Sequence, residues 1–460
     1  MTLLERLGRP SQLNVQVRIF ASRTSETIDN SYQKLKRKIH QRIVAEMTPD
    51  EQHILSTKNQ DVHAIEQVID TYVQKVIDSN PFSMPRGDRS RIISEIRDDM
   101  LGLGPIESLL KDDSVTEIMV NGSQKIFVER MGKLTLTDIR FHNDDHLMNI
   151  IERILSPLGR RIDESSPLVD ARLDDGSRVN IIIPPLSLIG PVVTIRKFSR
   201  TPLTLDNLIN FGTLDRRMAK FLQLCINARI NILVSGGTGS GKTTTLNALS
   251  SFVSPNERIV TIEDAAELQL QQPHVVTLES RPPNIEGSGQ ITIRDLVRNA
   301  LRMRPDRIIV GEVRSEEALD MPQAMNTGHD GSLTTSHANS PRDALSRLET
   351  MVMMAGFDLP IRAIREQISS AIDLIIHQGR IKDGSRKVTH ITEVQHIEGD
   401  IITTQDLFYY EMTGIDENGK AQGVFRATGL LPNFLEKFSA NGIELPGDIF
   451  QNSDISQGVF

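Results

Sequence analysis

One stretch, Gly236-Gly237-Thr238-Gly239-Ser240-Gly241-Lys242-Thr243, decides the fold of this chain of 460 residues. It fits the pattern G-x-x-x-x-G-K-[ST], in which glycines let consecutive backbone N–H groups curl around phosphate oxygens. The apolar run Asn231–Ser235 predicts a strand that leads into the loop, and Leu246 and Leu249 predict a helix after it. A helix N-terminus at this point favours anions, whereas a merely glycine-rich turn needs neither flank. We therefore expect a phosphate-binding loop between a strand and a helix.

This loop predicts the contacts of a nucleotide. Lys242 is expected to reach the β- and γ-phosphates, and the hydroxyl of Thr243 is expected to bind Mg²⁺. ATP and Mg²⁺ are thus the predicted ligand and metal. The residues expected to hold the nucleotide are Gly236, Gly237, Thr238, Gly239, Ser240, Gly241, Lys242, Thr243 and Thr244.

Two later apolar strands end in carboxylates. Ile259–Ile262 leads to Glu263-Asp264, and Arg307–Val310 leads to Gly311-Glu312. Because the carboxyl ends of parallel strands meet at one edge of a sheet, these acids should face the nucleotide. We predict that Glu312 polarises the attacking water and that Glu263 supports it, with both acids and Thr243 as candidate ligands of Mg²⁺. Strand-end acids that merely cap helices are the alternative.

A histidine in a polar loop is the third candidate. His337 lies in Thr335-Ser336-His337-Ala338-Asn339, after a short apolar stretch. An imidazole there could bond a γ-phosphate and respond to its loss. An ordinary surface or core histidine is an equally good interpretation. His329 is the weaker candidate for the same role.

Arginines outside the loop could stabilise charge on a transferring phosphoryl group. Arg172, Arg178 and Arg196 precede the phosphate-binding region, and Arg281 and Arg294 flank a loop rich in proline and glycine. For each of them a surface ion pair is the competing interpretation.

Composition narrows the class of protein. Hydrophobic residues make up 38% and charged residues 24% of the chain, as in globular proteins. The net charge of −8 argues against nonspecific DNA binding as the main activity. The single Cys225 excludes a four-cysteine zinc site and lies on an apolar helix stripe, which predicts a buried structural thiol. No apolar run reaches the roughly 20 residues that span a bilayer, so we expect a cytoplasmic protein with at most a peripheral membrane role.

The pattern of apolar residues changes along the chain and predicts its organisation. Residues 1–30 are expected to form a flexible arm and residues 31–110 a helical bundle. A period of two in residues 111–204 predicts a small α+β domain, with strands at 115–120, 125–129, 134–137 and 192–198 and a hairpin at 169–183. Residues 205–395 alternate helix and strand, which is typical of an α/β fold with a parallel-rich sheet. Residues 396–460 form a C-terminal segment without a clear assignment.

Ordered motifs over roughly Leu101–Phe450 resemble the type II/IV secretion-system ATPases, and most closely the CpaF-type motor of tight-adherence (Flp) pilus assembly. Thr261–Leu268 is similar to the Asp box of that family, Leu301–Arg314 to its Walker B region and Gly328–Ser340 to its His box. The remaining motifs are Gly102–Glu107, Val115–Gly122 and the P-loop Gly236–Thr243. A chain with all of these in order is identified as a member of the family.

The resemblance implies a RecA-like ATPase domain behind a regulatory N-terminal domain, assembled as a homohexameric ring. It implies that nucleotide sits between the two domains, that Arg172, Arg178 and Arg196 complete the site, and that motion passes to an integral inner-membrane platform and indirectly to pilin. No specific nucleic acid is expected as a partner. Pro322, inside a predicted helix, and Ser336, where an apolar residue is expected, depart from the family pattern.

Two other functions stay open from the sequence. One is a RecA-like ATPase that translocates DNA, against which the negative charge counts. The other is a nucleotide-gated scaffold with little turnover, against which the paired acids Glu263 and Glu312 count, because simple binding needs no polarised water.

Overall fold

The computed structural model describes residues 86–451 apart from Met131, 199–201, 284–287, Phe357 and Asn418. It also describes Lys36, Ile39, Arg42, 70–75 and Asp78. The predicted arm and most of the predicted helical bundle lie outside these residues. The chain divides into two compact units, Met1–Phe198 (the first unit) and Ser199–Phe460 (the second unit).

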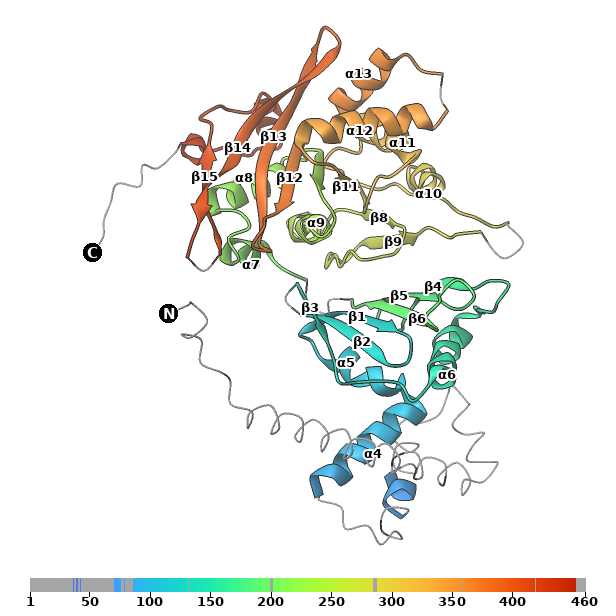
Figure 1. The fold of residues 1–460 in the computed structure, drawn as a ribbon. Coiled ribbons are helices and arrows are strands. Elements are labelled where there is room, and N and C mark those ends of the chain that lie inside the picture. Colours follow the sequence, from blue (N-terminus) through green and yellow to red (C-terminus); the bar gives the residue numbers. More distant parts are fainter. Residues whose placement is uncertain are drawn as a thin grey trace, which may run out of the picture. The chain divides into compact units, whose positions relative to one another are not determined.

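The first unit is built on a sheet of six strands in the order β3-β2-β1-β6-β5-β4, with every neighbouring pair antiparallel (Figure 1). Isoleucine and leucine side chains of α6 cover one face of it, and Asn143 caps this helix by accepting a hydrogen bond from His146 N at 2.9 Å. Its elements are α4 (Arg86–Leu101), η2 (Gly104–Ile106), α5 (Glu107–Lys111), β1 (Val115–Asn121), β2 (Lys125–Arg130), β3 (Lys133–Leu136), α6 (Asp144–Leu155), η3 (Ser156–Leu158), β4 (Leu168–Arg172), β5 (Arg178–Ile182) and β6 (Val192–Arg196). The strands lie where the sequence predicts them.

Within the predicted bundle, the apolar pattern predicts a helical stretch around Arg89–Leu110, and this prediction is wrong in its length. α4 ends at Leu101, and a short η2 and α5 follow it. Gly104 has a φ of +63°, and a Cβ there would lie 3.3 Å from Ile150 Cδ1 of α6. This left-handed glycine, followed by Pro105, stops the helix and turns the chain toward the sheet.

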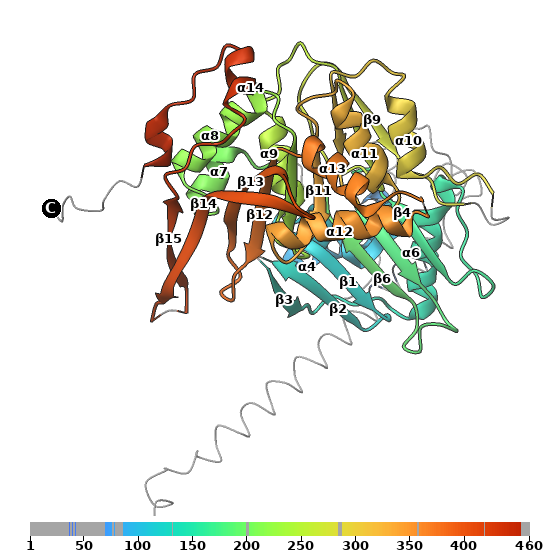
Figure 2. The ribbon, with the colours of Figure 1, turned by 90° about the horizontal axis from the view of Figure 1, so that it is seen from above.

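The second unit contains a sheet of nine strands in the order β15-β14-β13-β12-β7-β11-β10-β8-β9. The six strands from β12 to β9 pair in parallel, and β13, β14 and β15 form an antiparallel end (Figure 2). This arrangement confirms the predicted α/β fold with a parallel-rich, RecA-like sheet. The predicted C-terminal segment supplies β14 and β15 to the same sheet.

The elements of the second unit follow in chain order. They are α7 (Leu205–Asn210), α8 (Arg216–Asn227), β7 (Ile232–Gly236), α9 (Lys242–Ser250), β8 (Ile259–Glu263), β9 (Val275–Glu279), α10 (Ile293–Ala300), β10 (Arg307–Val310), α11 (Glu317–Asn326), β11 (Leu333–His337), α12 (Pro341–Met354), α13 (Ile361–Ala371), β12 (Leu374–Arg380), β13 (Arg386–Glu398), β14 (Ile401–Ile415), β15 (Ala421–Ala427), α14 (Leu435–Ala440) and η4 (Gly447–Phe450). α11 runs through Pro322, which is buried.

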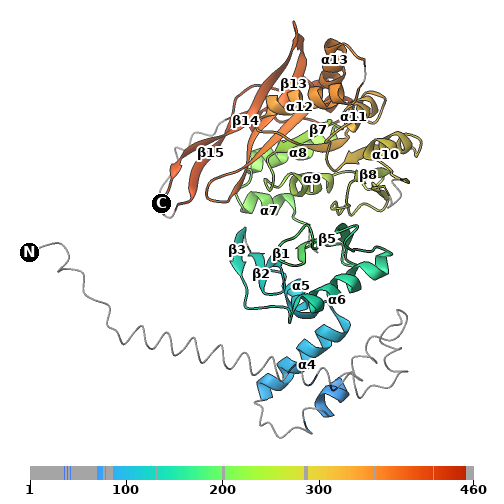
Figure 3. The same cartoon turned by 45° about the vertical axis from the view of Figure 1, so that its right-hand side comes forward.

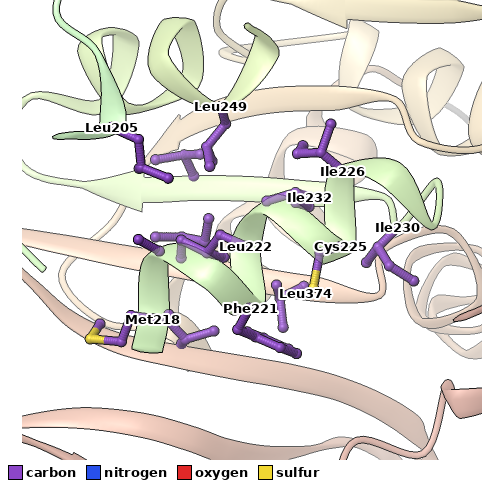
Figure 4. Close-up of a cluster of buried hydrophobic side chains, with 14 of the residues drawn as sticks. Leu205, Met218, Phe221, Leu222, Cys225, Ile226, Ile230, Ile232, Leu249 and Leu374 are labelled. Atoms are coloured by element: carbon purple, nitrogen blue, oxygen red, sulfur yellow. The ribbon is translucent and has the colours of Figure 1, made fainter. Parts of the chain in front are cut away.

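Helices cover both faces of this sheet (Figure 3). α7, α8 and α9 pack on one face, where Figure 4 shows Phe221 and Cys225 of α8 against Ile232 and Leu374 of the sheet. α10, α11, α12 and α13 pack on the other face. Cys225 is fully buried and its burial raises the pKa of the thiol, which confirms the predicted structural role. With both faces covered, the ends of the parallel strands are left to carry polar side chains.

Candidate functional site

The P-loop begins at the carboxyl end of β7 and runs into α9. A Cβ at Gly236 would lie 2.1 Å from the carbonyl oxygen of Gln378, so no side chain fits there. Gly241 has a φ of +97° and caps α9, which therefore has no side-chain cap among the described residues. The N-terminus of α9, which has no side-chain cap, therefore favours an anion such as a phosphate.

Lys242 and His337 meet beside this loop. Lys242 Nζ donates to the carbonyl oxygen of Gly237 at 3.2 Å and lies 3.4 Å from His337 Nδ1. His337 is the last residue of β11, which pairs with β7 so that His337 lies opposite Gly236. The structure thus brings together the lysine and the histidine that the sequence predicted at a γ-phosphate.

Glu312 lies on the far side of His337. His337 Nε2 is 2.8 Å from Glu312 Oε1, although the two are not aligned as a hydrogen bond. The other oxygen, Glu312 Oε2, accepts a hydrogen bond of 2.6 Å from Arg314, whose guanidinium also lies 3.5 Å from Asp264 Oδ2. Lys242, His337, Glu312 and Arg314 therefore form one continuous chain of polar contacts.

Glu263 is held differently. Its carboxylate accepts backbone hydrogen bonds from Glu267 N at 2.8 Å and Leu268 N at 3.2 Å, and only 3% of the residue is exposed. These bonds fix the Asp-box loop after β8. Glu263 also packs against Gly311, where a Cβ would lie 2.7 Å from Glu263 Cγ, so the two predicted acids belong to adjoining strand ends.

Electrostatics keep His337 neutral. Burial lowers the pKa of His337 below its ordinary value of 6.5 by more than the Glu312 carboxylate raises it, and Lys242, Arg314 and Arg347 lower it further. A neutral ring with its proton on Nε2 presents a lone pair to Lys242 and an N–H to Glu312. His337 can therefore report a change at either neighbour.

The sequence missed three polar side chains at this site. Arg314 stands two residues after Glu312, at the end of the stretch that resembles the Walker B region. Its closeness to Glu312 in the sequence could have marked it as a site residue. Gln378 Oε1 accepts a hydrogen bond of 2.7 Å from Thr245 of α9, and Arg386 Nε donates to the carbonyl oxygen of Gly239 at 2.9 Å. Gln378 and Arg386 come from β12 and β13, and no local pattern marks them.

The three arginines of the first unit lie in one row. Arg172 pairs with Arg178 across β4 and β5, and Arg178 pairs with Arg196 across β5 and β6. The alternating residues Val179, Ile181 and Ile195 are buried under α6, so the arginines lie on the opposite face. The sequence did not predict that these three arginines are neighbours on one face of the sheet.

The other candidates lie in ordinary structural contacts. Arg294 forms ion pairs with Asp320 at 2.9 Å and Glu316 at 2.8 Å, as the competing interpretation of this arginine expects. Arg281 Nε donates to Gly289 O at 2.8 Å within its own loop. His329 precedes β11, at the opposite end of that strand from His337, and bonds the carbonyl oxygen of Ala324 at 3.2 Å.

The residues present fit a phosphate ligand. Within the described part of the chain, Ser240 Oγ of the P-loop is buried without a hydrogen-bond partner, and Glu312 Oε1, whose 2.8 Å contact with His337 Nε2 is not aligned as a hydrogen bond, is an acceptor suited to a water or a cation. Buried polar atoms of this kind are uncommon in native proteins, and a ligand or water normally satisfies them. Of the residues described, no three His, Cys, Asp or Glu side chains cluster as a metal site, so Mg²⁺ would depend on Thr243, one or two carboxylates and the phosphates themselves.

Known proteins share this sequence pattern. The family model described as "Type II/IV secretion system protein" matches residues 99–426. A putative conjugal transfer protein of Mycobacterium tuberculosis is 37% identical over 310 residues, which are 66% of this chain and 88% of that protein. The conjugal transfer protein TrbB of Rhizobium radiobacter is 35% identical over 294 residues, 63% of this chain and 86% of the relative.

The chain belongs to the type II/IV secretion system protein family. Among solved structures, the VirB11 ATPase of the Brucella suis type IV secretion system is similar over 62% of this chain and 94% of that chain, with 29% identity and a TM-score of 0.35. Members of this family are secretion ATPases, so nucleotide binding is expected of the fold. None of the helices described is long and apolar enough to cross a membrane.

Proposed function

We propose that this chain binds Mg-ATP at the P-loop and hydrolyses it to drive a secretion or pilus-assembly machine. The observation that carries the proposal is the continuous contact chain Lys242–His337–Glu312–Arg314 at the carboxyl ends of β7, β11 and β10. A scaffold that only bound nucleotide would need the P-loop but not a carboxylate held between a histidine and an arginine.

Each residue has a role that follows from its position. The N–H groups of residues 236–244 and the ammonium of Lys242 bind the phosphates. When it does so, Lys242 gives up its hydrogen bond to the carbonyl oxygen of Gly237. Glu312 accepts a proton from, or orients, the attacking water, while His337 and Arg314 hold its carboxylate in place. Glu263 fixes the Asp-box loop beside it through two backbone bonds.

Mg²⁺, when bound with ATP, would neutralise charge on the phosphate oxygens. Thr243 at the start of α9 would hold it. Glu312 and Glu263, which follow or end the neighbouring strands β10 and β8, are the candidate carboxylates. The row Arg172–Arg178–Arg196 is proposed to add positive charge at a phosphoryl group, in the same chain or in a neighbouring copy.

The finer assignment is a homohexameric motor at the cytoplasmic side of the inner membrane, which acts on an integral platform protein and through it on Flp pilin. Support for it comes from the CpaF-type motifs and from relatives whose names refer to conjugal transfer and type IV secretion. A role in moving DNA is the rival that those names also suggest.

Two measurements test this proposal. Phosphate release from Mg-ATP by the purified chain should fall by about 10² to 10³ in Lys242→Ala, and added single- or double-stranded DNA should not stimulate the wild-type rate. The mass of the Glu312→Gln protein in Mg-ATP, measured by light scattering, should approach six chains. DNA-stimulated turnover would favour translocation, and a monomer with no turnover would favour a scaffold.

A further inference from the structure

The last part of β12 lies beside the strand that carries the P-loop. In the parallel pairing of β12 with β7, His377 lies opposite Ser235 and Gln378 opposite Gly236. Successive strand residues point to opposite faces, so these two side chains contact the P-loop strand from opposite sides. Gln378 lies on the side of α9, where it bonds Thr245, and its carbonyl oxygen packs against Gly236. This end of β12 therefore shapes the start of the P-loop.

His377 lies on the other face, toward α12 and α13, and is 7% exposed. Its Nδ1 is 2.8 Å from Ser235 Oγ, in the residue immediately before the P-loop. The backbone of Asn339, two residues after His337, lies close enough to the same imidazole to raise its pKa. One side chain thus bonds the start of the P-loop and lies against the segment that follows His337.

The Asn339 segment is itself fixed to α12. Asn339 N donates to Asp343 Oδ2 at 2.8 Å, and Ser340 caps the helix by accepting from Asp343 N at 3.0 Å. The His337 segment is therefore held by α12 on one side and by the pairing of β11 with β7 on the other, where His337 lies opposite Gly236.

Burial favours the neutral imidazole, which has one donor and one acceptor. The buried hydrogen bond to Ser235 Oγ restricts the orientation of the ring, which lies against Asn339 on its other side. Lys242 and His337, 3.4 Å apart, come from α9 and β11, whose positions depend on the segments on either side of His377.

We propose that His377 is a positioning residue for ATP hydrolysis, which holds the P-loop strand and the His337 segment in register so that Lys242 and His337 act on one γ-phosphate. The proposal rests on the proposed function. A misplacement of about 1 Å costs on the order of 10²-fold in rate when a reaction depends on alignment, so the expected effect is on kcat rather than on nucleotide affinity.

The test compares His377→Leu, which removes the bond to Ser235 at similar volume, with His377→Gln, which keeps a donor and an acceptor. Ser336→Ala is the matched control. Ser336 lies in the same row, opposite Ser235, is fully buried, and its Oγ has no hydrogen-bond partner among the described residues. Loss of that hydroxyl should change little, because no bond is broken.

We expect His377→Leu to lower kcat for ATP at least about tenfold while the Kd for ATP stays within about threefold, and His377→Gln and Ser336→Ala to stay within about threefold of wild type. If His377→Leu does not fold, Ser235→Ala removes the same bond from its other partner and should lower kcat in the same way.

A folded His377→Leu or Ser235→Ala protein with wild-type kcat would overturn the inference. So would a parallel loss of kcat and affinity that His377→Gln does not restore, because that is the result of general disruption. Absence of ATP hydrolysis in the wild-type chain would instead overturn the proposed function, and this inference with it.

Discussion

The two ends of the parallel strands in the second unit differ in how their polar groups are paired. At the amino ends, Arg307 donates to both oxygens of Glu257 at 2.8 and 3.0 Å and to the carbonyl oxygen of Ile226 at 2.9 Å. Asn231 accepts from Gly331 N and Ser332 N and donates to Ala371 O. At the carboxyl ends, within the described residues, Ser240 Oγ is buried without a hydrogen-bond partner, and Glu312 Oε1 has only the unaligned contact with His337 Nε2 at 2.8 Å.

This difference separates stability from function within one sheet. A buried polar group that is fully bonded fixes the fold, and removing one partner leaves the other unpaired. A buried polar group without a partner destabilises the folded chain and is available to a ligand. Substitutions at the amino ends should therefore change the free energy of unfolding, and substitutions at the carboxyl ends should change catalysis.

The largest effect is expected at the amino ends. Arg307→Met should lower the free energy of unfolding by about 3 to 5 kcal/mol in urea titrations, because Glu257 loses a bidentate partner in a buried site. Arg229→Gln is the control, since Arg229 pairs with the same Glu257 but its side chain is a third exposed, and it should cost less than about 1 kcal/mol. Equal costs for the two variants would contradict the comparison.

Lys242→Ala, at the carboxyl ends, should lower catalysis with little change in the free energy of unfolding. We expect kcat/KM for ATP to fall by about 10² to 10³ because a charge that stabilises the transferring phosphoryl group is lost, with less than about 1 kcal/mol of change in unfolding. Phosphate release and urea unfolding of the same preparation measure both. Lys220→Ala, which changes an exposed lysine of α8, serves as the control. A large loss of stability in Lys242→Ala would contradict the proposed difference between the two ends of the strands.

His377 should give stability that depends on pH. Burial, then the neighbouring His390 and the more distant Lys242, lower the pKa of His377 from 6.5 to about 4, against the opposing effects of Asn339 and Asp343. The unfolded chain therefore binds more protons between these values, so this contribution is present above pH 6.5 and is lost as the pH falls toward 4. We expect wild type to lose about 2 kcal/mol more than His377→Gln between pH 7 and pH 5. Parallel pH profiles for the two proteins would show that His377 is not the cause.

Arg314→Gln should have the smallest effect. Arg314 donates to Glu312 Oε2, so its loss frees one carboxylate oxygen and should lower kcat about tenfold with a smaller change in KM. Arg298→Gln, which removes a comparable exposed arginine from Asp320, should leave kcat unchanged. A rise in kcat for Arg314→Gln would mean that the arginine restrains Glu312 rather than positions it.

The sequence predicted those parts of the site that local motifs encode. The P-loop, the strand-end acids Glu263 and Glu312 and the residue His337 each stand in a short pattern of apolar strand followed by polar loop. Because parallel strands end at a common edge of the sheet, the sequence alone indicates that these residues lie close together. The roles of these residues in catalysis stay predictions.

The sequence could not predict the groups that arrive from far along the chain. His377, Gln378 and Arg386 reach the P-loop through strand pairing over more than a hundred residues, which no local period records. The long strands β13 and β14 were missed although they form a local hairpin with Glu398 opposite Ile401, because the register between them shifts at Ile391/Thr392 and at Val394/Ile397, so no single alternating period runs along them. The break after Leu101 depends on Gly104 packing against Ile150 of α6.

The most direct test of the account is the rate of phosphate release by Glu312→Gln, measured together with its Kd for ATP. The substitution keeps the shape of the side chain between His337 and Arg314 but removes its negative charge. We expect ATP to bind within about threefold of wild type while turnover falls at least about 10²-fold, because the proton acceptor is gone. Wild-type turnover in Glu312→Gln would contradict the assignment of Glu312 as the residue that activates water.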